Sequence, residues 1–437
     1  MKQLSFSYEY SCLISRENII QLSQKILLQI EQVRYALSQK YKSEFASLYV
    51  PQDKHMLLNI QKVCEEKRKL SIDILIVIGI GGSSLGARAI HEALHGILYN
   101  EKNPSVLIYF LETVDTDFTT NLIALVEHAI CNNKQVLINV ITKSGTTTET
   151  IINFELFLSL LKKYYSHNYS ERIVVTTGKT SPLWEYASRE GFVTLEIPEQ
   201  VGGRYSVFTA VGLFPLMMLD VNIPLLLEGA YAAVNQGLNN SVFENFSMLN
   251  ALIKYAHYLD GLHVHDLFVF DISLKACGEW YRQLIAESLG KSYKVGDTEV
   301  FVGILPTVSV GSIDLHSVAQ LYLGGPRVRH TTFIGIEHMH HVIALPNIQY
   351  DTLQVHNKNM HDIMNALLLG AQKAYRKKEL PFCTILLPEK KPFYIGYLLQ
   401  NFMLEVIYLG YLFGVNPFDQ PHIELYKKET RKALEHV

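Results

Sequence analysis

The chain has few cysteines, and they show no pairing pattern. Its 5 cysteines are an odd number in 437 residues, none forms a C-x-x-C pair, and they are scattered at Cys12, Cys64, Cys131, Cys277 and Cys383. This distribution argues against a disulfide framework and a cysteine-based zinc site, and it is typical of reduced thiols. We therefore expect a cytoplasmic protein.

The chain also lacks an excess of charge of one sign and a long apolar run. It carries 39 Lys and Arg against 42 Asp and Glu, so its formal net charge of −3 predicts neither a nucleic-acid partner nor a membrane surface. The N-terminus has no apolar signal core, and no apolar run approaches the roughly 18 residues of a membrane span. Glu405 interrupts the apolar stretch from Phe402 to Phe413, which indicates a buried helix.

What the sequence has instead is a regular alternation of strand and helix patterns. Amphipathic helices are predicted over 15–40 and 54–69, and a buried strand at 74–78 precedes a helix from Leu85 to Leu94. The alternation continues with strands at 105–111, 135–141, 172–176 and 192–197, separated by helices at 117–128, 148–163 and 182–190. This order predicts a doubly wound parallel sheet, in which ligands bind beyond the carboxyl ends of the strands.

A second alternation follows a helical region at 206–236. It comprises helices at 244–260, 274–289 and 312–323, strands at 266–270, 331–336 and 383–387, and C-terminal helices at 394–414 and 420–435. We therefore expect an α/β protein, because strands and helices alternate in both halves. Its predicted parts are an N-terminal helical segment over 1–70, α/β domains over 71–238 and 239–415, and a C-terminal helical arm over 416–437.

The first candidate site is the loop G-I-G-G-S-S-L-G, which begins at Gly79. Its glycines allow a tight turn, and Ser83 and Ser84 can cap the helix that follows. A strand, a Gly/Ser loop and a helix N-terminus together form an anion site. The loop lacks the G-K-[ST] ending of a Walker loop and the third glycine of the dinucleotide pattern. A tight strand-to-helix connection without a ligand is the alternative interpretation.

A second candidate loop, T-K-S-G-T-T-T-E, runs from Thr142 to Glu149. Five hydroxyls, a flexible glycine and Lys143 supply many donors and one positive charge, which suits a phosphate monoester. Thr148 can cap the following helix, and a polar capping turn with an exposed lysine is the alternative. Because both loops follow strands of the same predicted sheet, we expect them to lie at one edge and to favour a bound phosphate.

Two further positions carry charge in suggestive surroundings. Arg204 follows two glycines in V-G-G-R-Y-S, where it can clamp a carboxylate, a phosphate or a developing oxyanion; a surface arginine is the alternative. Gln283 and Glu287 are spaced i, i+4 and share one helix face near apolar residues. A carboxylate in such surroundings can act as a general base, although a helical glutamate is often only a solvated charge.

Histidines are the remaining candidates. His316 lies in D-L-H-S, where Asp314 can cap a helix or orient the imidazole ring, and a structural histidine is the alternative. A second group, Glu337-His338-Met339-His340-His341 with His330, suggests a metal. It lacks the H-x-x-x-H spacing of a helical zinc site, so we expect no metal and no cofactor.

Six motifs in this order resemble the glucose-6-phosphate isomerase family in its shorter bacterial form. They are GIGGSSLG, TKSGTTTET, VGGRYS, the Gln283/Glu287 helix, DLHS, and NPFDQ with a downstream lysine, and they span about residues 74 to 427. The resemblance implies two doubly wound sugar-isomerase (SIS-type) domains, a homodimer and no cofactor. It also implies that glucose 6-phosphate and fructose 6-phosphate are interconverted in glycolysis and gluconeogenesis, through ring opening and a cis-enediol(ate).

The resemblance assigns a role to each matched residue. It implies that the phosphate is held by Thr142, Lys143, Ser144 and Thr147, and that Gly82, Ser83, Gln283 and Gln420 make further substrate contacts. It implies that Glu287 is the base that moves the C1/C2 proton and that Arg204 stabilises the enediolate. His316 and Lys427 are implied as the ring-opening pair, with His316 supplied by the neighbouring subunit.

The chain departs from the family's pattern in three places. His422 follows Pro421 where this form usually has glycine, the loop-rich stretch over 291–313 is unusual, and the first 50 residues match weakly. Two alternatives stay open. One is a related isomerase for another phosphosugar, such as mannose 6-phosphate. The other is a sugar-phosphate-binding regulator on the same fold, which would not need Glu287, His316 or Lys427.

Overall fold

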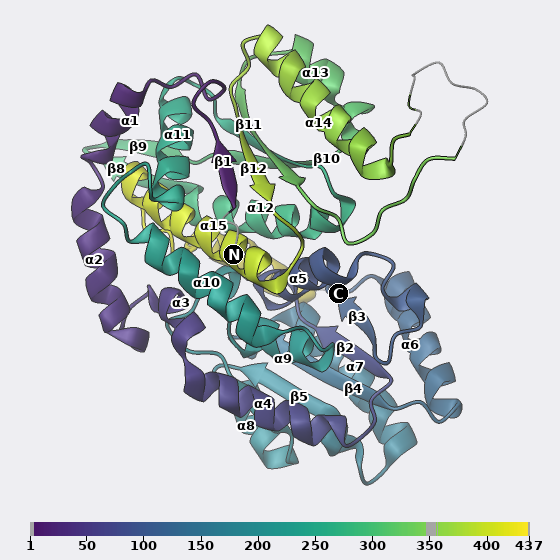
Figure 1. Cartoon of the computed structure of the whole chain (residues 1–437). Coiled ribbons are helices and arrows are strands. Elements are labelled where there is room, and N and C mark those ends of the chain that lie inside the picture. The colour runs from purple at the N-terminus through teal and green to yellow at the C-terminus, as the bar shows by residue number, and fades with distance from the viewer. Residues whose placement is uncertain (1–3, 347–354, 356, 436–437) are drawn as a thin grey trace.

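The computed structural model describes residues 4–346, 355 and 357–435, which form two parallel sheets with helices between and around them (Figure 1). The first sheet has the order β3-β2-β4-β5-β6, and all neighbouring strands are parallel. Its strands are β2 (Ile74–Ile78), β3 (Leu107–Leu111), β4 (Val136–Thr142), β5 (Ile173–Thr177) and β6 (Val193–Glu196). Each strand of the first alternation is therefore confirmed to within two residues.

The helices of this half connect consecutive parallel strands of the sheet. They are α5 (Leu85–His95), α6 (Thr116–Cys131), α7 (Thr148–Tyr165) and α8 (Pro182–Glu190). From β2 the chain passes to β3 on one side and then to β4 on the other. The point where the strand order reverses therefore lies between β2 and β4, and ligands of doubly wound sheets bind at that point.

The second sheet has the order β1-β12-β11-β7-β10. Its parallel strands are β7 (Val264–Val269), β10 (Leu305–Val310), β11 (Arg329–Ile336) and β12 (Phe382–Leu387). The short strand β1 (Ser5–Ser7), which the sequence did not predict, pairs antiparallel with β12 and covers that edge. The doubly wound arrangement is confirmed here as well, with the reversal between β7 and β11.

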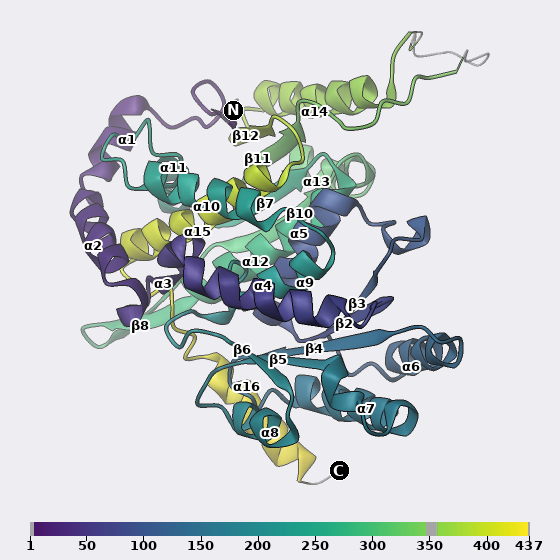
Figure 2. The same ribbon diagram turned by 60° about the horizontal axis from the view of Figure 1, so that its bottom comes forward.

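Helices fill the space between the two sheets, as Figure 2 shows most directly. They include α4 (Lys54–Arg68), α9 (Ala210–Met218), α10 (Ile223–Gly237), α11 (Phe246–Leu259), α12 (Lys275–Leu289) and α15 (Pro392–Phe413). One continuous apolar core joins this layer to the inner faces of both sheets, with Leu75 and Val77 from the first and Leu267 and Val269 from the second. The two halves therefore share their core.

Helix α15 is long and apolar enough to cross a membrane by length and composition alone. Its most apolar window is 89% buried inside the protein, which is the environment expected of a central core helix. Gly396 packs so closely on α10 that a Cβ there would lie 2.0 Å from the Leu226 carbonyl oxygen. Glu405, in the middle of α15, forms an ion pair with Lys254 at 3.0 Å, and both side chains are fully buried.

Several predicted elements are wrong in their extent. The helix expected over 15–40 is α1 (Arg16–Ser23) and α2 (Leu27–Ser38), separated by a turn whose backbone hydrogen bonds span three residues. The helix expected over 312–323 is a 3₁₀ turn η8 (Ile313–Leu315) followed by α13 (Ala319–Gly324). Helix α14 (Met360–Lys377) was not expected from the sequence pattern. The last helix, α16 (Ile423–Leu434), is close to its predicted bounds.

The stretch over 291–313 is not loop-rich. It contains an antiparallel hairpin of β8 (Lys291–Val295) and β9 (Thr298–Val302), followed by β10. The turn of the hairpin is Gly296-Asp297, and Gly296 has a φ of +60°. A two-residue Gly-Asp turn of this kind is a hairpin signal, because glycine adopts a positive φ at little cost.

The remaining short helical segments lie in the connections. They are α3 (Ala46–Tyr49) and the 3₁₀ turns η1 (Lys40–Lys42), η2 (Val50–Gln52), η3 (Gly81–Ser83), η4 (Asn100–Lys102), η5 (Tyr169–Arg172), η6 (Gly203–Tyr205) and η7 (Ile272–Leu274). Of these, η3 and η6 belong to predicted site loops. They follow β2 and β6 of the first sheet.

Candidate active site

The two donor-rich loops lie side by side, as the sequence predicts. The turn η3 follows β2, the loop over 143–147 follows β4, and these strands are hydrogen-bonded neighbours. Both loops therefore flank the reversal point of the first sheet. The expectation that they share one edge is confirmed.

The hydroxyls at these loops do not cap the helices, which corrects the sequence analysis. Ser84 occupies the N-cap position of α5, but its hydroxyl donates to Glu112 Oε1 at 2.6 Å. Thr147, not Thr148, is the N-cap residue of α7, and its hydroxyl bonds that of Thr142 at 2.8 Å. Ser83 lies in η3 and makes no cap bond.

The other two helices of this sheet are capped by side chains. Asp115 accepts from the Phe118 N–H at the start of α6, and Ser181 accepts from the Trp184 N–H at the start of α8. The N-termini of α5 and α7 therefore differ from those of α6 and α8 by presenting N–H groups that no cap side chain occupies. Such groups, together with the helix dipole, favour an anion.

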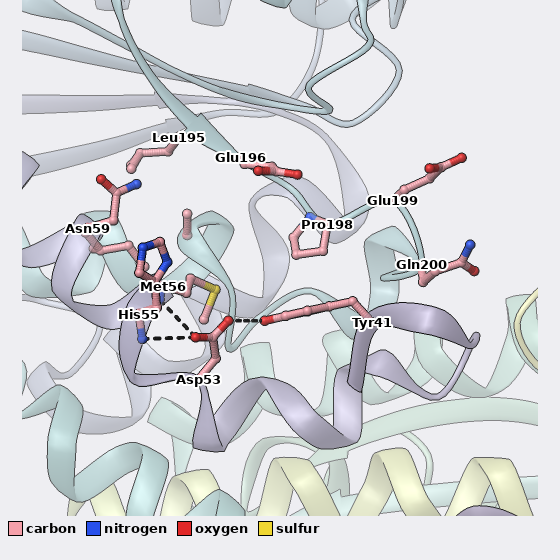
Figure 3. A pocket seen from close by; sticks show the side chains of 12 residues that line it. Tyr41, Asp53, His55, Met56, Asn59, Leu195, Glu196, Pro198, Glu199 and Gln200 are labelled. Atoms are coloured by element: carbon pink, nitrogen blue, oxygen red, sulfur yellow. Dashed lines mark hydrogen bonds between the residues drawn. The ribbon is translucent and has the colours of Figure 1, made fainter. Parts of the chain in front are cut away.

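Lys143 supplies the positive charge at this position. Its Nζ donates to the backbone carbonyl oxygen of Glu199 at 2.6 Å, and partial burial lowers the pKa of its ammonium. Glu199 also lines a cavity of about 420 Å³ that Asp53 and Tyr41 border from the other side (Figure 3). The cavity contains none of the predicted site residues, so it lies outside the candidate active site.

Arg204 is buried, with 2% of its surface exposed. Gly82 packs closely on Gly203, the residue before Arg204, so a Cβ on Gly82 would lie 2.2 Å from the Gly203 carbonyl carbon. The guanidinium donates from Nε to Ser288 Oγ at 2.7 Å, and from Nη2 to the carbonyl oxygens of Pro417 and Asp419 at 2.6 and 2.9 Å. The alternative of a surface arginine is therefore wrong.

Gln283 and Glu287 share one face of α12, as predicted, and that face points at Arg204. Gln283 Nε2 donates to Glu287 Oε1 at 2.9 Å, and Arg204 Nη1 lies 3.4 Å from Glu287 Oε2. Gln420 Oε1 accepts from the same Nη1 at 3.3 Å. Gly81, at a φ of +61°, leaves room for the Gln283 amide, because a Cβ there would lie 2.9 Å from Nε2. A carboxylate, a guanidinium and two amides thus converge beside η3.

Two predicted residues are not part of this cluster within the chain. His316 is exposed just beyond η8. The carboxylate of Asp314 accepts from the Val310 N–H at 2.7 Å and from Ser317 Oγ at 2.6 Å, so it neither caps the helix nor orients the imidazole ring. Lys427 lies on α16, where its Nζ pairs with Glu424 at 2.8 Å.

The predicted histidine group is dispersed. His340 Nε2 bonds the Lys390 carbonyl oxygen, whereas His330 is buried in the core, stacked between His257 and His265 with ring centroids 4.9 and 4.7 Å away. Burial holds the pKa of His330 well below its usual value. Among residues 4–346, 355 and 357–435, no group of three or more His, Cys, Asp or Glu side chains is arranged to hold a metal ion.

Sequence reasoning missed two residues that touch the cluster. Ser288 anchors Arg204, and Lys291 contacts both the end of α12 and the segment before α16. Ser288 sits one residue after Glu287, so it could have been noticed from its position. Lys291 gives no local signal, because its partner Asp419 lies 128 residues away in sequence.

The fold is that of a doubly wound α/β protein, and in its candidate site a carboxylate meets a guanidinium near two helix N-termini without side-chain caps. The sequence pattern of the family described as phosphoglucose isomerase matches residues 64–437. The glucose-6-phosphate isomerase of Clostridium tetani is 37% identical over 392 residues, which cover 87% of this chain and 84% of that protein. The chain belongs to the phosphoglucose isomerase family.

Solved structures agree with the fold. A hypothetical protein from Thermus thermophilus superposes with a TM-score of 0.85 at 27% identity, over 99% of this chain and all of that one (100%). A glucose-6-phosphate isomerase from Chlamydia trachomatis superposes with a TM-score of 0.84 at 20% identity, over 99% and 88% of the two chains. Family membership makes the chain an aldose–ketose isomerase of glucose 6-phosphate and fructose 6-phosphate, in glycolysis and gluconeogenesis.

Proposed function

We propose that this isomerisation takes place at the reversal point of the first sheet, with Glu287 as the base and Arg204 as the group that stabilises the enediolate. The observation that carries this proposal is the contact of Arg204 with Glu287, beside the uncapped N-termini of α5 and α7. In this proposal, Glu287 and Arg204 lie at the reacting end of the open-chain sugar phosphate, and the N–H groups of the helix N-termini lie at its phosphate end.

The phosphate end is held by the loop over 142–147. Lys143 and Ser144, with Thr142 and Thr147, surround the start of α7, and Gly82 and Ser83 contribute backbone and hydroxyl groups from η3. The phosphate is remote from the reacting carbons, so its binding energy positions the substrate for the chemical step.

At the reacting end, Glu287 removes a proton from the carbon next to the carbonyl group and returns it to the neighbouring carbon. The carboxylate is held by Gln283, and its side chain is only 26% exposed, so it is partly shielded from water. The enediolate carries negative charge on oxygen, which the guanidinium of Arg204 offsets. Gln283 and Gln420 supply amide groups for the substrate hydroxyls.

Ring opening requires an acid and a base, for which we propose His316 of a second copy and Lys427. The proposal of a homodimer is supported by apolar side chains at the carboxyl edge of the second sheet. These exposed residues line one groove: Ile97, Leu98, Ile272, Ile343 and Met360. Ile272 follows β7 and His316 follows the neighbouring strand β10, so both lie at that edge. Exposed apolar grooves are typical of protein–protein interfaces.

We also propose the division into a helical segment (1–70), two sugar-isomerase domains (71–238 and 239–415) and an arm (416–437). The strand β1 and the shared core join the first three of these parts, whereas helix α16 of the arm has no buried residue of its own among those described. A cytoplasmic location is supported by the five cysteines, which are all unpaired, four of them buried.

A panel assay with the purified wild-type protein and Glu287→Gln tests the proposed site and the preference among phosphosugars. Glucose 6-phosphate, mannose 6-phosphate and other hexose 6-phosphates are each offered, and the ketose product is measured with a coupled enzyme. We expect glucose 6-phosphate to give the largest kcat/KM. An unchanged kcat in Glu287→Gln would contradict the proposed site, and faster turnover of mannose 6-phosphate would mean that the chain prefers that phosphosugar.

A further inference from the structure

Lys291, the first residue of β8, is a buried cation that the mechanism above does not use. Only 7% of its surface is exposed. Its Nζ donates to the Glu287 carbonyl oxygen at 2.9 Å and to the Asp419 carbonyl oxygen at 2.8 Å, and it lies 3.0 Å from Asp419 Oδ1. An ammonium has three N–H donors, so each donor has one acceptor.

These acceptors belong to two elements that the proposed chemistry needs. Glu287 ends the reactive face of α12, and Asp419 immediately precedes Gln420. The carbonyl oxygen of Asp419 accepts from Lys291 and also from Arg204 Nη2, at 2.8 and 2.9 Å. A shift of this one carbonyl group would therefore displace the guanidinium as well.

A second contact joins the same two segments. His422 Nε2 lies 3.3 Å from the backbone nitrogen of Ser292, the residue after Lys291. This contact joins the base of the β8–β9 hairpin to the start of the arm.

We propose that Lys291 is a positioning residue, which ties the end of α12 to segment 417–420 and so fixes Glu287, Arg204 and Gln420 relative to one another. This inference rests on the proposed roles of these three residues. Helix α16 has no buried residue of its own among those described, so contacts at 417–422 hold the arm. Burial lowers the pKa of the Lys291 ammonium, and Asp419 opposes that shift by favouring the charged form.

The variant Lys291→Met tests this role, because methionine keeps much of the apolar stem and removes the ammonium. We expect kcat to fall about 10- to 100-fold, since a displacement of roughly 1 Å at a reacting group costs up to about 10²-fold. KM should change less than about threefold, because the phosphate loop does not touch Lys291. Lys291→Arg, which keeps charged donors, should recover most of the lost kcat.

Lys67→Met is the matched control. Lys67 is 2% exposed and also donates to a backbone carbonyl oxygen, that of Glu171 at 2.9 Å, but it lies on α4 away from the cluster. We expect Lys67→Met to keep the wild-type kcat. In a hydrogen-exchange experiment, the amides of 417–434 should exchange faster in Lys291→Met than in the wild-type protein. Their exchange rates should be unchanged in Lys67→Met.

The exchange measurement needs no substrate, so it stands even if the proposed function fails. Failure of the proposed site would instead appear as wild-type turnover of glucose 6-phosphate by Glu287→Gln and Arg204→Ala. An unchanged rate of exchange over 417–434, a rise in KM at constant kcat, or an equal loss of kcat in both variants would overturn the role of Lys291. So would a Lys291→Met protein that does not fold while Lys67→Met does, since Lys291 would then support the fold as a whole.

Discussion

Arg204 Nη1 is shared between Glu287 Oε2 at 3.4 Å and Gln420 Oε1 at 3.3 Å. The other nitrogens of the same guanidinium make bonds of 2.6 to 2.9 Å to Ser288, Pro417 and Asp419. Charge-assisted hydrogen bonds are usually about 2.7–2.9 Å long, so the two contacts of Nη1 are weaker than those of the other two nitrogens. In the proposed mechanism, Nη1 is therefore the nitrogen whose hydrogens an oxyanion can accept without moving the planar guanidinium.

Replacing this arginine should affect the chemical step most. Loss of one oxyanion donor commonly lowers kcat by roughly 10²–10³-fold, so we expect at least that loss in Arg204→Ala, with a smaller change in KM. The free energy of unfolding should also fall, by about 1–3 kcal/mol, because buried carbonyl oxygens lose their donor. Steady-state kinetics and urea unfolding measure the two effects.

Tyr205→Phe is the control for that experiment. The Tyr205 hydroxyl contacts Ser288 Oγ at 3.1 Å and the Pro417 carbonyl oxygen at 3.3 Å, so it shares these neighbours with Arg204 but has no charge to offer. It should lose stability with little change in kcat. A full kcat in Arg204→Ala would contradict the role given to Arg204.

Glu287→Gln should abolish most isomerisation while the substrate still binds. The amide keeps the shape and an oxygen for Gln283, but it does not accept a proton at neutral pH. General-base catalysis contributes roughly 10²–10⁴-fold, and kcat should fall by at least this factor. Exchange of the substrate C2 hydrogen with deuterated water should stop as well; if it continues in the variant, another group is the base.

Lys143→Ala should raise KM and leave kcat nearly unchanged, because a phosphate contact is equally strong before and during the reaction. The change is measured with glucose 6-phosphate at saturating and limiting concentrations. Lys134→Ala is a suitable control, since Lys134 is 57% exposed and pairs with Asp73 at 2.8 Å. A large loss of kcat with unchanged KM in Lys143→Ala would indicate a role in the chemical step.

The buried histidine stack should make the protein sensitive to acid. Burial lowers the pKa of His257 to about 4 and holds those of His265 and His330 well below 6.5. In the unfolded chain these rings take up protons near pH 6.5, so the unfolded state binds more protons below that pH. The contribution of these histidines to the free energy of unfolding should therefore be complete above about pH 6.5 and decrease as the pH falls toward 4.

In this pH range, each ring changes the free energy of unfolding by up to about 1.4 kcal/mol per pH unit. Urea unfolding at several pH values between 7.5 and 4.5 gives the slope. His330→Phe should reduce the slope by about one ring's share. An equal slope in wild type and variant would mean that other groups cause the acid sensitivity.

A mixture of two inactive variants tests whether the site is shared between subunits. If His316 reaches the partner's site, refolding Glu287→Gln together with His316→Ala gives mixed dimers with one intact site and one doubly defective site. About half of the dimers are mixed, so roughly a quarter of the wild-type activity should return. If each His316 serves its own chain, activity stays at the level of the separate variants.

The sequence predicted the parts of the site that follow from local patterns. The Gln283/Glu287 face comes from helical spacing, and the neighbouring loops come from the alternation of strands and helices. The sequence pattern predicts a loop-rich stretch where the hairpin at 291–302 lies, although Gly296-Asp297 carries a hairpin signal. The caps predicted at Ser84 and Thr148 are wrong. The Ser84 hydroxyl bonds Glu112, 28 residues away, and the N-cap position of α7 belongs to Thr147, whose hydroxyl bonds Thr142.

Other features have no local signature at all. The burial of Arg204 depends on carbonyl groups at 417 and 419, and the three contacts of Lys291 depend on the same distant segment. Contacts across more than a hundred residues are decided by how the chain packs, which periodicity and composition do not encode.

The uncapped helices α5 and α7 mean that the free protein is less stable than the same fold with full caps. An N-cap hydrogen bond typically stabilises a helix by about 1 kcal/mol, so two open N-termini forgo about 2 kcal/mol. An anion that binds there restores this stability by mass action, through linkage between binding and folding. A substitution that capped either helix would stabilise the free protein and fill the proposed phosphate site. Under that proposal, the stability of this loop pair can rise only at the expense of its affinity for phosphate.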